Sequence, residues 1–177
     1  MIMNFYKKFK CPIVLTNAGV NLQGTSSDIA AALAGTVTTH TATITITNSN
    51  YTVAEVVTIN NGNSGTLNFS TNDTNLVGSG ADIAAALAGS FTVGYTGTAT
   101  LTDNHTLAEL VAINNGTTGN ITLNSNAVAL TGSTSDVKAA LAGNVGAVYT
   151  GNIVLNDADN ASITATDITT IESDTTG

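Results

Sequence analysis

The sequence predicts a repeat solenoid of the α/β class, rich in β-structure, with short strands in parallel sheet and two-turn helices along one side. Three observations predict this fold. A block of about 54 residues occurs three times, each copy carries two short helix signals, and segments of alternating apolar and polar residues lie between those signals. Repeats of this length are typical of stacks in which each unit buries its apolar face against the next.

The repeat consists of two blocks that recur in the same order. The first block reads LQGTSSDIAAALAG, LVGSGADIAAALAG and LTGSTSDVKAALAG, and its copies start at Leu22, Leu76 and Leu130. The second block reads TVAEVVTINNG, TLAELVAINNG and TATDITTIESD, and its copies start at Thr52, Thr106 and Thr164. The last copy begins four residues later than a spacing of 54 requires. We place these four residues within 156–163, a polar turn where an insertion costs little.

The phase of these blocks divides the chain into a tail and three repeats. The tail covers residues 1–11, and the repeats cover 12–65, 66–119 and 120–177. Two helix signals in each repeat give about six half-units in one continuous array.

Each half-unit has its own helix start signal. The first helix of each repeat is expected to begin at an aspartate N-cap and to end at a glycine; the aspartates are Asp28, Asp82 and Asp136. The second helix begins at a threonine, with an acidic residue three positions later, which predicts a capping box. These pairs are Thr52 with Glu55, Thr106 with Glu109, and Thr164 with Asp167. Helices of two turns require packing to be stable.

Strand candidates lie between the helices. Thr41–Thr47 alternates strictly, and Thr66–Ser70 and Asn120–Asn124 alternate apolar with polar residues. The apolar residues Ile44 and Ile46 fall out of phase by one position with Ala99 and Leu101 in the next copy. A bulge is one explanation for this mismatch, and Gly97 is the other.

Charge is sparse and negative. The chain has twelve acidic residues and four lysines, for a net charge of −8, and Lys138 is the one cation after residue 11. Such a body repels phosphate backbones, which excludes nucleic acid as a partner. No apolar run is long enough to span a membrane, and the single cysteine, Cys11, gives no disulfide framework. A surface of Thr, Asn and Ser suits an extracellular, cell-surface or virion location.

We expect no catalytic residues, no cofactor and no metal centre. His40 corresponds to Gly94 in the next copy and His105 to Tyr51 in the previous one, so neither histidine recurs. Asp157 and Asp159 are candidate Ca²⁺ ligands, although a solvated turn is the preferred interpretation. Asparagines at the end of the second block are expected to form a ladder of side-chain hydrogen bonds; they are Asn60, Asn61, Asn114 and Asn115.

The segments TVAEVVTINNGNSGT, TLAELVAINNGTTGN and DITTIESDTTG resemble the Val-Ala-Glu-Leu…Ile-Asp…Thr-Thr-Gly repeats of very large "β-strand repeat" proteins. Those proteins occur mainly in marine cyanobacteria and other aquatic bacteria. The DIAAALAG blocks resemble their Ala-Asp-Val-Ala-Ala-Ala blocks, which alternate with the former. The resemblance covers residues 12–177. It implies a secreted, surface or appendage protein with a structural or adhesive role, and it carries no catalytic residues.

The leading functional hypothesis is a subunit of an extracellular filament or surface appendage. Gly177 matches the ends of the first two repeats, and the first repeat begins at Pro12, so the end of one copy matches the beginning of another. Head-to-tail contact of this kind generates an open homopolymer. The residues expected at the assembly interface are Pro12, Ile13, Leu15, Ile171 and Gly177.

Two alternatives stay open. In the first, the chain is the N-terminal part of a giant repeat adhesin or of a viral or phage fibre. In the second, the chain is a solenoid that binds ice or polysaccharide through a threonine array. The array would use Thr41, Thr43, Thr45, Thr47, Thr96, Thr98, Thr100 and Thr102. In the third copy, the matching positions hold only one threonine, Thr150. Surface glycans are candidate partners, because Asn-x-Ser/Thr sequons are frequent.

Overall fold

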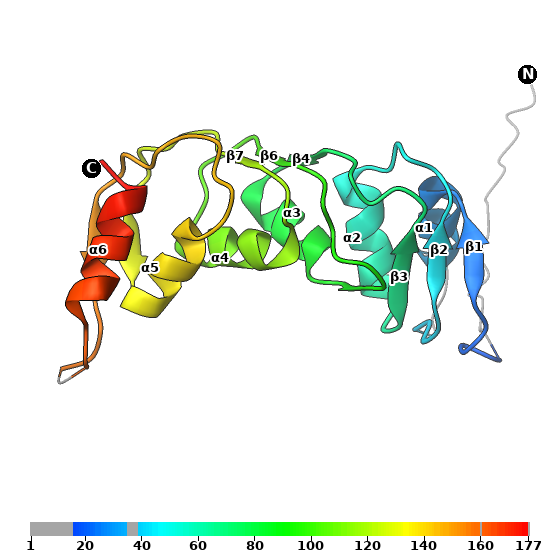
Figure 1. The fold of residues 1–177 in the computed structure, drawn as a ribbon. Coiled ribbons are helices and arrows are strands. Elements are labelled where there is room, and N and C mark those ends of the chain that lie inside the picture. The colour runs from blue at the N-terminus through cyan, green and yellow to red at the C-terminus, as the bar shows by residue number, and fades with distance from the viewer. Residues whose placement is uncertain (1–15, 35–38, 160, 177) are drawn as a thin grey trace, which may run out of the picture.

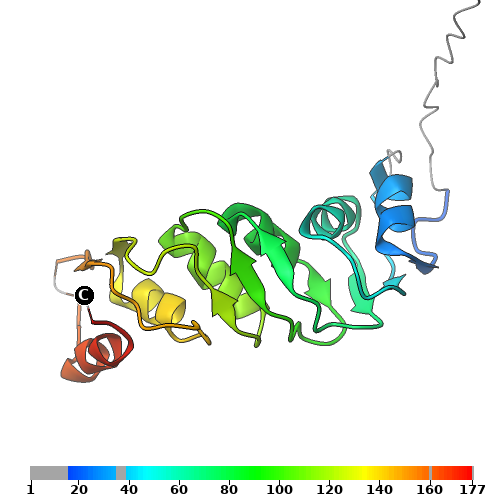
Figure 2. The same cartoon turned by 90° about the horizontal axis from the view of Figure 1, so that it is seen from above.

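The computed structural model describes residues 16–34, 39–159 and 161–176. Within them the chain has an α/β fold with parallel sheets and six helices, and Figures 1 and 2 show an elongated molecule. The elements in chain order are β1 (Leu22–Gly24), α1 (Ser26–Ala34), β2 (Ile44–Ile46), α2 (Val53–Gly62), β3 (Thr66–Phe69), β4 (Leu76–Gly78), α3 (Gly80–Leu87), β5 (Ser90–Phe91), β6 (Ala99–Leu101), α4 (Leu107–Gly116), β7 (Ile121–Thr122), β8 (Leu130–Gly132), α5 (Thr134–Leu141), β9 (Ile153–Leu155) and α6 (Ala165–Asp174).

The helices form a row in chain order. Each of the first five packs against the next one along the chain, from α1 to α6. In Figure 1 they follow one another along the long axis, with β1 and α1 at one end and α6 at the other. The six short helices expected from the sequence are therefore present. The boundaries of the three repeats stay a prediction.

The strands form three separate parallel sheets rather than one. Their orders are β1-β2-β3-β5, β4-β6-β7 and β8-β9. Paired residues such as Leu22, Ile44 and Leu67 lie 22 or 23 positions apart, so each strand pairs with one from the next turn of the chain. β3 and β4 both lie between α2 and α3, so this turn supplies two strands, and each extends a different sheet. The alternation in the sequence marks strands but cannot assign them to sheets.

The phase mismatch between Ile44 and Ala99 has a simple origin. Leu76 pairs with Ala99 as Leu22 pairs with Ile44, so the equivalent residues are 55 positions apart. The loop 102–106 that follows β6 is one residue shorter than the loop 47–52 that follows β2, which restores the spacing of the helices. The bulge proposed from the sequence is not needed to explain why the apolar residues of both strands face inward.

The core is built from aliphatic side chains at helical and strand periodicity. The helices α1, α3 and α5 bury an i, i+4 pair, for example Ile83 and Leu87. The helices α2 and α4 bury an i, i+3 pair, for example Leu110 and Ile113. Each of the helices α1 to α5 therefore presents a narrow apolar stripe, which neighbouring turns cover.

The N-caps of the first helices differ from the prediction. Ser79 and Ser133, not Asp82 and Asp136, are the N-cap residues of α3 and α5. Each serine hydroxyl accepts a hydrogen bond from the aspartate N–H three residues later and donates one to that carboxylate. Thr25 makes the same two contacts with Asp28 before α1. The predicted aspartates are N3 residues, because the hydroxyl reaches the free N–H groups of the first turn.

The capping boxes of the second helices are confirmed. Thr52, Thr106 and Thr164 are the N-caps of α2, α4 and α6, and each accepts from the backbone of the acidic N3 residue. The carboxylates of Glu55, Glu109 and Asp167 accept in return from the backbone N–H of the cap. Local sequence alone determines this contact, because all of its atoms lie within four residues.

Glycines occur where successive turns of the backbone touch. A Cβ at Gly119 would overlap the carbonyl of Gly97, and a Cβ at Gly97 would overlap the carbonyl of Thr74. Gly65 and Gly151 make equivalent close approaches to Ala42 and Val128. The stack requires glycine here because no side chain fits between two backbone segments.

We expect Gly119→Ala to lower the free energy of unfolding by about 1–3 kcal/mol, because the added methyl group forces two turns apart. Gly94→Ala is the matched control, since a Cβ at Gly94 meets no described atom within 4 Å. Urea unfolding followed by circular dichroism measures both changes. Equal stability of the two variants would contradict this account of the turns.

Candidate functional site

The polar side chains that recur along this chain lie at the contacts between neighbouring units. We treat these contacts as the candidate site. A side chain with an aromatic ring and a polar atom at its end recurs in each repeat. These residues are His40, Tyr95 and Tyr149, and each is at most 2% exposed. His40 Nε2 lies 2.6 Å from the carbonyl oxygen of Val20. The hydroxyls of Tyr95 and Tyr149 donate to the carbonyls of Thr74 and Val128.

The counterpart of His40 is therefore Tyr95, not Gly94 as the sequence alignment predicted. The residue added before β6 shifts the equivalence by one position. At this position each ring contacts a carbonyl oxygen of the preceding turn, which thereby has a hydrogen-bond partner. A sequence comparison at a constant offset of 54 residues could not show that His40 and Tyr95 are equivalent, because they are 55 residues apart.

A second aromatic side chain, Tyr51 in one repeat and His105 in the next, contacts the tyrosine of the following repeat. The hydroxyl of Tyr51 donates to that of Tyr95 at 3.2 Å, and His105 Nε2 lies 2.9 Å from the hydroxyl of Tyr149. His105 and Tyr51 are equivalent, as predicted, and both are buried. Burial raises the pKa of Tyr149 to about 12 and lowers the pKa of His105. Burial therefore disfavours the charged form of the His105 imidazole.

Asparagine side chains connect the second helix of one repeat to the first helix of the next. Asn60 Nδ2 donates to the carbonyls of Ala85 and Ala86, at 3.1 and 2.7 Å, at the end of α3. Asn114 donates in the same way to Ala139 and Ala140 near the end of α5. These carbonyls have no partner within their own helix, so an amide donor from the neighbour satisfies them.

This geometry corrects the predicted asparagine ladder. Asn60 and Asn114 bond to helix carbonyls rather than to each other, and Asn61 and Asn115 are exposed. The glycine after each helix makes the approach possible, because a Cβ at Gly89 or Gly143 would overlap the asparagine amide.

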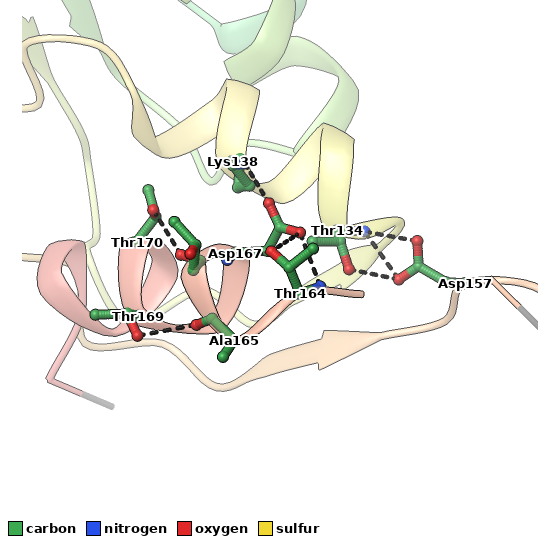
Figure 3. Close-up of polar contacts among 9 residues, drawn as sticks. Thr134, Lys138, Asp157, Thr164, Ala165, Asp167, Thr169 and Thr170 are labelled. Carbon is green, nitrogen blue, oxygen red and sulfur yellow. Dashed lines mark hydrogen bonds and ion pairs between the residues drawn. The ribbon is translucent and has the colours of Figure 1, made fainter. Parts of the chain in front are cut away.

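The N-termini of the first helices also receive a side chain from the following loop. Gly80 N–H donates to Asp103 Oδ1 at 2.8 Å, and Ser26 N–H donates to Asn48 Oδ1 at 2.8 Å. Figure 3 shows the third case, in which Asp157 accepts from both the backbone N–H and the hydroxyl of Thr134. An oxygen ligand is favoured here because the helix N-terminus carries partial positive charge.

This capping contact occupies one of the two candidate Ca²⁺ ligands. Both carboxylate oxygens of Asp157 lie within 3.2 Å of Thr134 N, whereas Asp159 is exposed on the same loop. Across the described part of the chain, no three His, Cys, Asp or Glu side chains are grouped so as to hold a metal ion.

Lys138 pairs with Asp167 across α5 and α6 at 2.5 Å, as Figure 3 shows. The same carboxylate accepts from Thr164 in the capping box. In the first repeat, the equivalent Glu55 accepts from Ser26 of the neighbouring helix at 2.9 Å. In the first and third repeats the acidic N3 residue therefore has two partners, the N-cap threonine of its own helix and a residue of the preceding helix.

Most residues of the predicted assembly interface lie outside the described residues, namely Pro12, Ile13, Leu15 and Gly177. Ile171 is described, and its side chain is only 6% exposed and belongs to the core. The solvent-facing row of the sheets mixes residue types. Thr45 lies between Gln23 and Asn68, and Thr100 between Val77 and Thr122.

No family model, curated protein or solved structure matches this chain. The similarity to β-strand repeat proteins therefore stays a prediction from the sequence. No helix among the described residues is long and apolar enough to cross a membrane.

We expect Asn114→Ala to lower the free energy of unfolding by about 1–2 kcal/mol, because the carbonyls at the end of α5 lose their donor. Asn115→Ala, one residue further on an exposed position, is the control and should change stability by less than about 0.5 kcal/mol. Thermal and urea unfolding measure the difference. If both variants match the wild type, the asparagine contact does not hold the units together.

The stability of the chain should fall in acid. The hydrogen bond from Thr134 lowers the pKa of Asp157, and the one from Lys138 lowers the pKa of Asp167, both from an ordinary value of 3.8. A depressed folded-state pKa gives stability that is present above about pH 4 and lost as the pH falls further. Asp157→Asn should be less stable at pH 7 and show a shallower loss between about pH 4 and pH 2. Urea midpoints against pH test this, with Asp159→Asn as control; parallel profiles for wild type and Asp157→Asn would refute it.

Proposed function

We propose that this chain is a non-catalytic structural module of an extracellular or cell-surface assembly, in which its six half-units form a solenoid. One observation carries the proposal. The recurring polar side chains join one unit to the next: Asn60 and Asn114 bond to helix ends, and Asp103 and Asp157 bond to helix starts. A chain built in this way uses its polar chemistry to maintain a stack.

The solenoid is supported by contacts that recur along the chain. Each helix packs on its neighbours in sequence, and strands pair in parallel with strands 22 to 24 residues away. Contacts restricted to adjacent units make a quasi-one-dimensional body. Bodies of this kind serve as spacers and scaffolds because their length follows the number of units.

The extracellular location is proposed from the surface and the sequence similarity. All twelve acidic residues lie after residue 11, and the remaining polar surface is largely Thr, Asn, Ser and Gly. The similarity to β-strand repeat proteins implies the same setting. Exposed sequon residues, such as Asn50, Asn104 and Asn115, would carry glycans if the chain passes through a glycosylating export route.

Immunogold electron microscopy with an antibody against the purified protein tests the location. We expect label on the surface of intact source cells or particles, or on appendages attached to them. Permeabilised cells are the control. Label that appears only after permeabilisation would overturn the proposed location, and with it a surface role.

A further inference from the structure

His105 is a titratable side chain enclosed at the contact between the second and third repeats. It lies in the loop before α4, it is 3% exposed, and its Nε2 atom lies 2.9 Å from the hydroxyl of Tyr149. The other ring nitrogen, Nδ1, is buried and has no hydrogen-bond partner among the described residues. A buried polar atom without a partner is uncommon in folded proteins, and this one can also bind a proton.

The hydrogen bonds of Tyr149 determine which nitrogen of His105 carries the hydrogen. The Tyr149 hydroxyl donates its single proton to the carbonyl oxygen of Val128 at 2.5 Å. The same hydroxyl can therefore only accept from His105, so Nε2 carries the hydrogen of the neutral ring and Nδ1 has a free lone pair. A proton added to His105 goes to Nδ1, where it creates a buried N–H without an acceptor and a buried positive charge. Both changes cost free energy.

The titratable groups that face His105 are Asp103 in its own loop, Glu109 of α4 and Tyr149. The two carboxylates favour the charged ring, but desolvation by burial is the larger effect and lowers the pKa of His105 from its ordinary value of 6.5. Both carboxylates already accept from backbone N–H groups, and neither bonds to Nδ1. The Tyr149 phenol stays neutral, because burial raises its pKa to about 12.

The equivalent position in the preceding joint holds a tyrosine. The hydroxyl of Tyr51 lies 2.7 Å from the carbonyl oxygen of Thr71 and 3.2 Å from the hydroxyl of Tyr95. A phenol does not take up a proton in mildly acidic solution, whereas an imidazole does. At this position, therefore, only the later joint carries a side chain that titrates there.

We propose that the contact between the second and third repeats at His105 is a proton-sensitive joint, which opens in mild acid. In the closed joint Nδ1 is shielded and the ring is neutral. When the joint opens, water reaches Nδ1 and the ring binds a proton, so the open form gains population as the pH falls below about 6.5. The stabilisation from the neutral ring is complete above that pH. This property goes beyond a purely structural role, because it makes the rigidity of the stack depend on its surroundings.

Two equivalent backbone amides provide a readout with an internal control. Thr150 follows Tyr149 directly, and its N–H donates to the carbonyl oxygen of Asn126 at 2.8 Å. One repeat earlier, the N–H of Thr96 donates to the carbonyl oxygen of Asn72 at 3.0 Å. Because local opening exposes an amide to exchange with solvent, loss of the Tyr149 contact should be detected at the first amide and not at the second.

The test is native-state hydrogen exchange of the full chain, followed by NMR at about pH 7 and about pH 5. Each exchange rate is divided by that of an unstructured peptide at the same pH, so that only protection is compared. We expect the protection of the Thr150 N–H to fall at least about fivefold at the lower pH, and that of Thr96 to stay unchanged. The loss of stability linked to Asp157 begins below about pH 4 and lies outside this range.

Two variants remove the proton-binding group. His105→Tyr restores the residue of the preceding joint, and His105→Gln keeps a donor toward Tyr149 in a side chain that does not titrate. His40 is present in every chain, so differences between the chains report on His105. Circular dichroism identifies the variants that fold, and the glutamine variant serves if the tyrosine variant does not. In either folded variant, Thr150 should have the same protection at both pH values.

The proposal is overturned if Thr150 of the wild type is equally protected at both pH values, or if Thr96 loses as much protection as Thr150. Persistence of the loss in a folded variant would also overturn it. Nitrogen-15 NMR of the imidazole tests the assigned tautomer: at about pH 7 we expect a hydrogen on Nε2 of His105, and a hydrogen on Nδ1 would refute the argument. None of these outcomes bears on the surface location, which immunogold labelling tests separately.

Discussion

Each helix of this chain is eight to ten residues long, and helices of that length are marginal in water without packing. The strands are shorter still, at two to four residues. No unit can therefore bury its own apolar stripe, and every unit depends on the turn before it and the turn after it. This constraint explains why the same positions recur at close approaches, such as Gly97 and Gly119, where one backbone lies directly on another.

The joints between units share a geometry but differ in chemistry. Between the first and second repeats, Tyr51 and Tyr95 lie among phenylalanine rings, with Tyr51 and Phe69 centroids 4.6 Å apart. In the next joint, the ring of His105 contacts that of Tyr149, with centroids 5.8 Å apart. At the last helix contact, Lys138 and Asp167 form an ion pair. The stack tolerates such exchanges because each joint needs a filled space and a satisfied carbonyl rather than a particular side chain.

Local features of the structure could be predicted from the sequence. The capping boxes at Thr52, Thr106 and Thr164 were predictable because donor and acceptor lie three residues apart. The number of helices followed from the start signals in the same way. The first helices were harder, because Ser79 and Asp82 are both good capping residues and only the backbone geometry shows which one precedes the helix.

Contacts between successive turns of the chain could not be predicted from the sequence. The sequence shows that Asn60 and Asn114 recur, but the carbonyls they bond to lie 25 and 26 residues away and depend on how the turns are stacked. The same holds for His40 and Tyr95, whose equivalence requires the one-residue shift before β6. By itself the sequence determined the repeat, the starts of the second helices and the strand alternation, because these depend on neighbours along the chain. The tertiary structure alone decided which strands share a sheet and which polar groups meet, because those choices depend on the path of the backbone between one turn and the next.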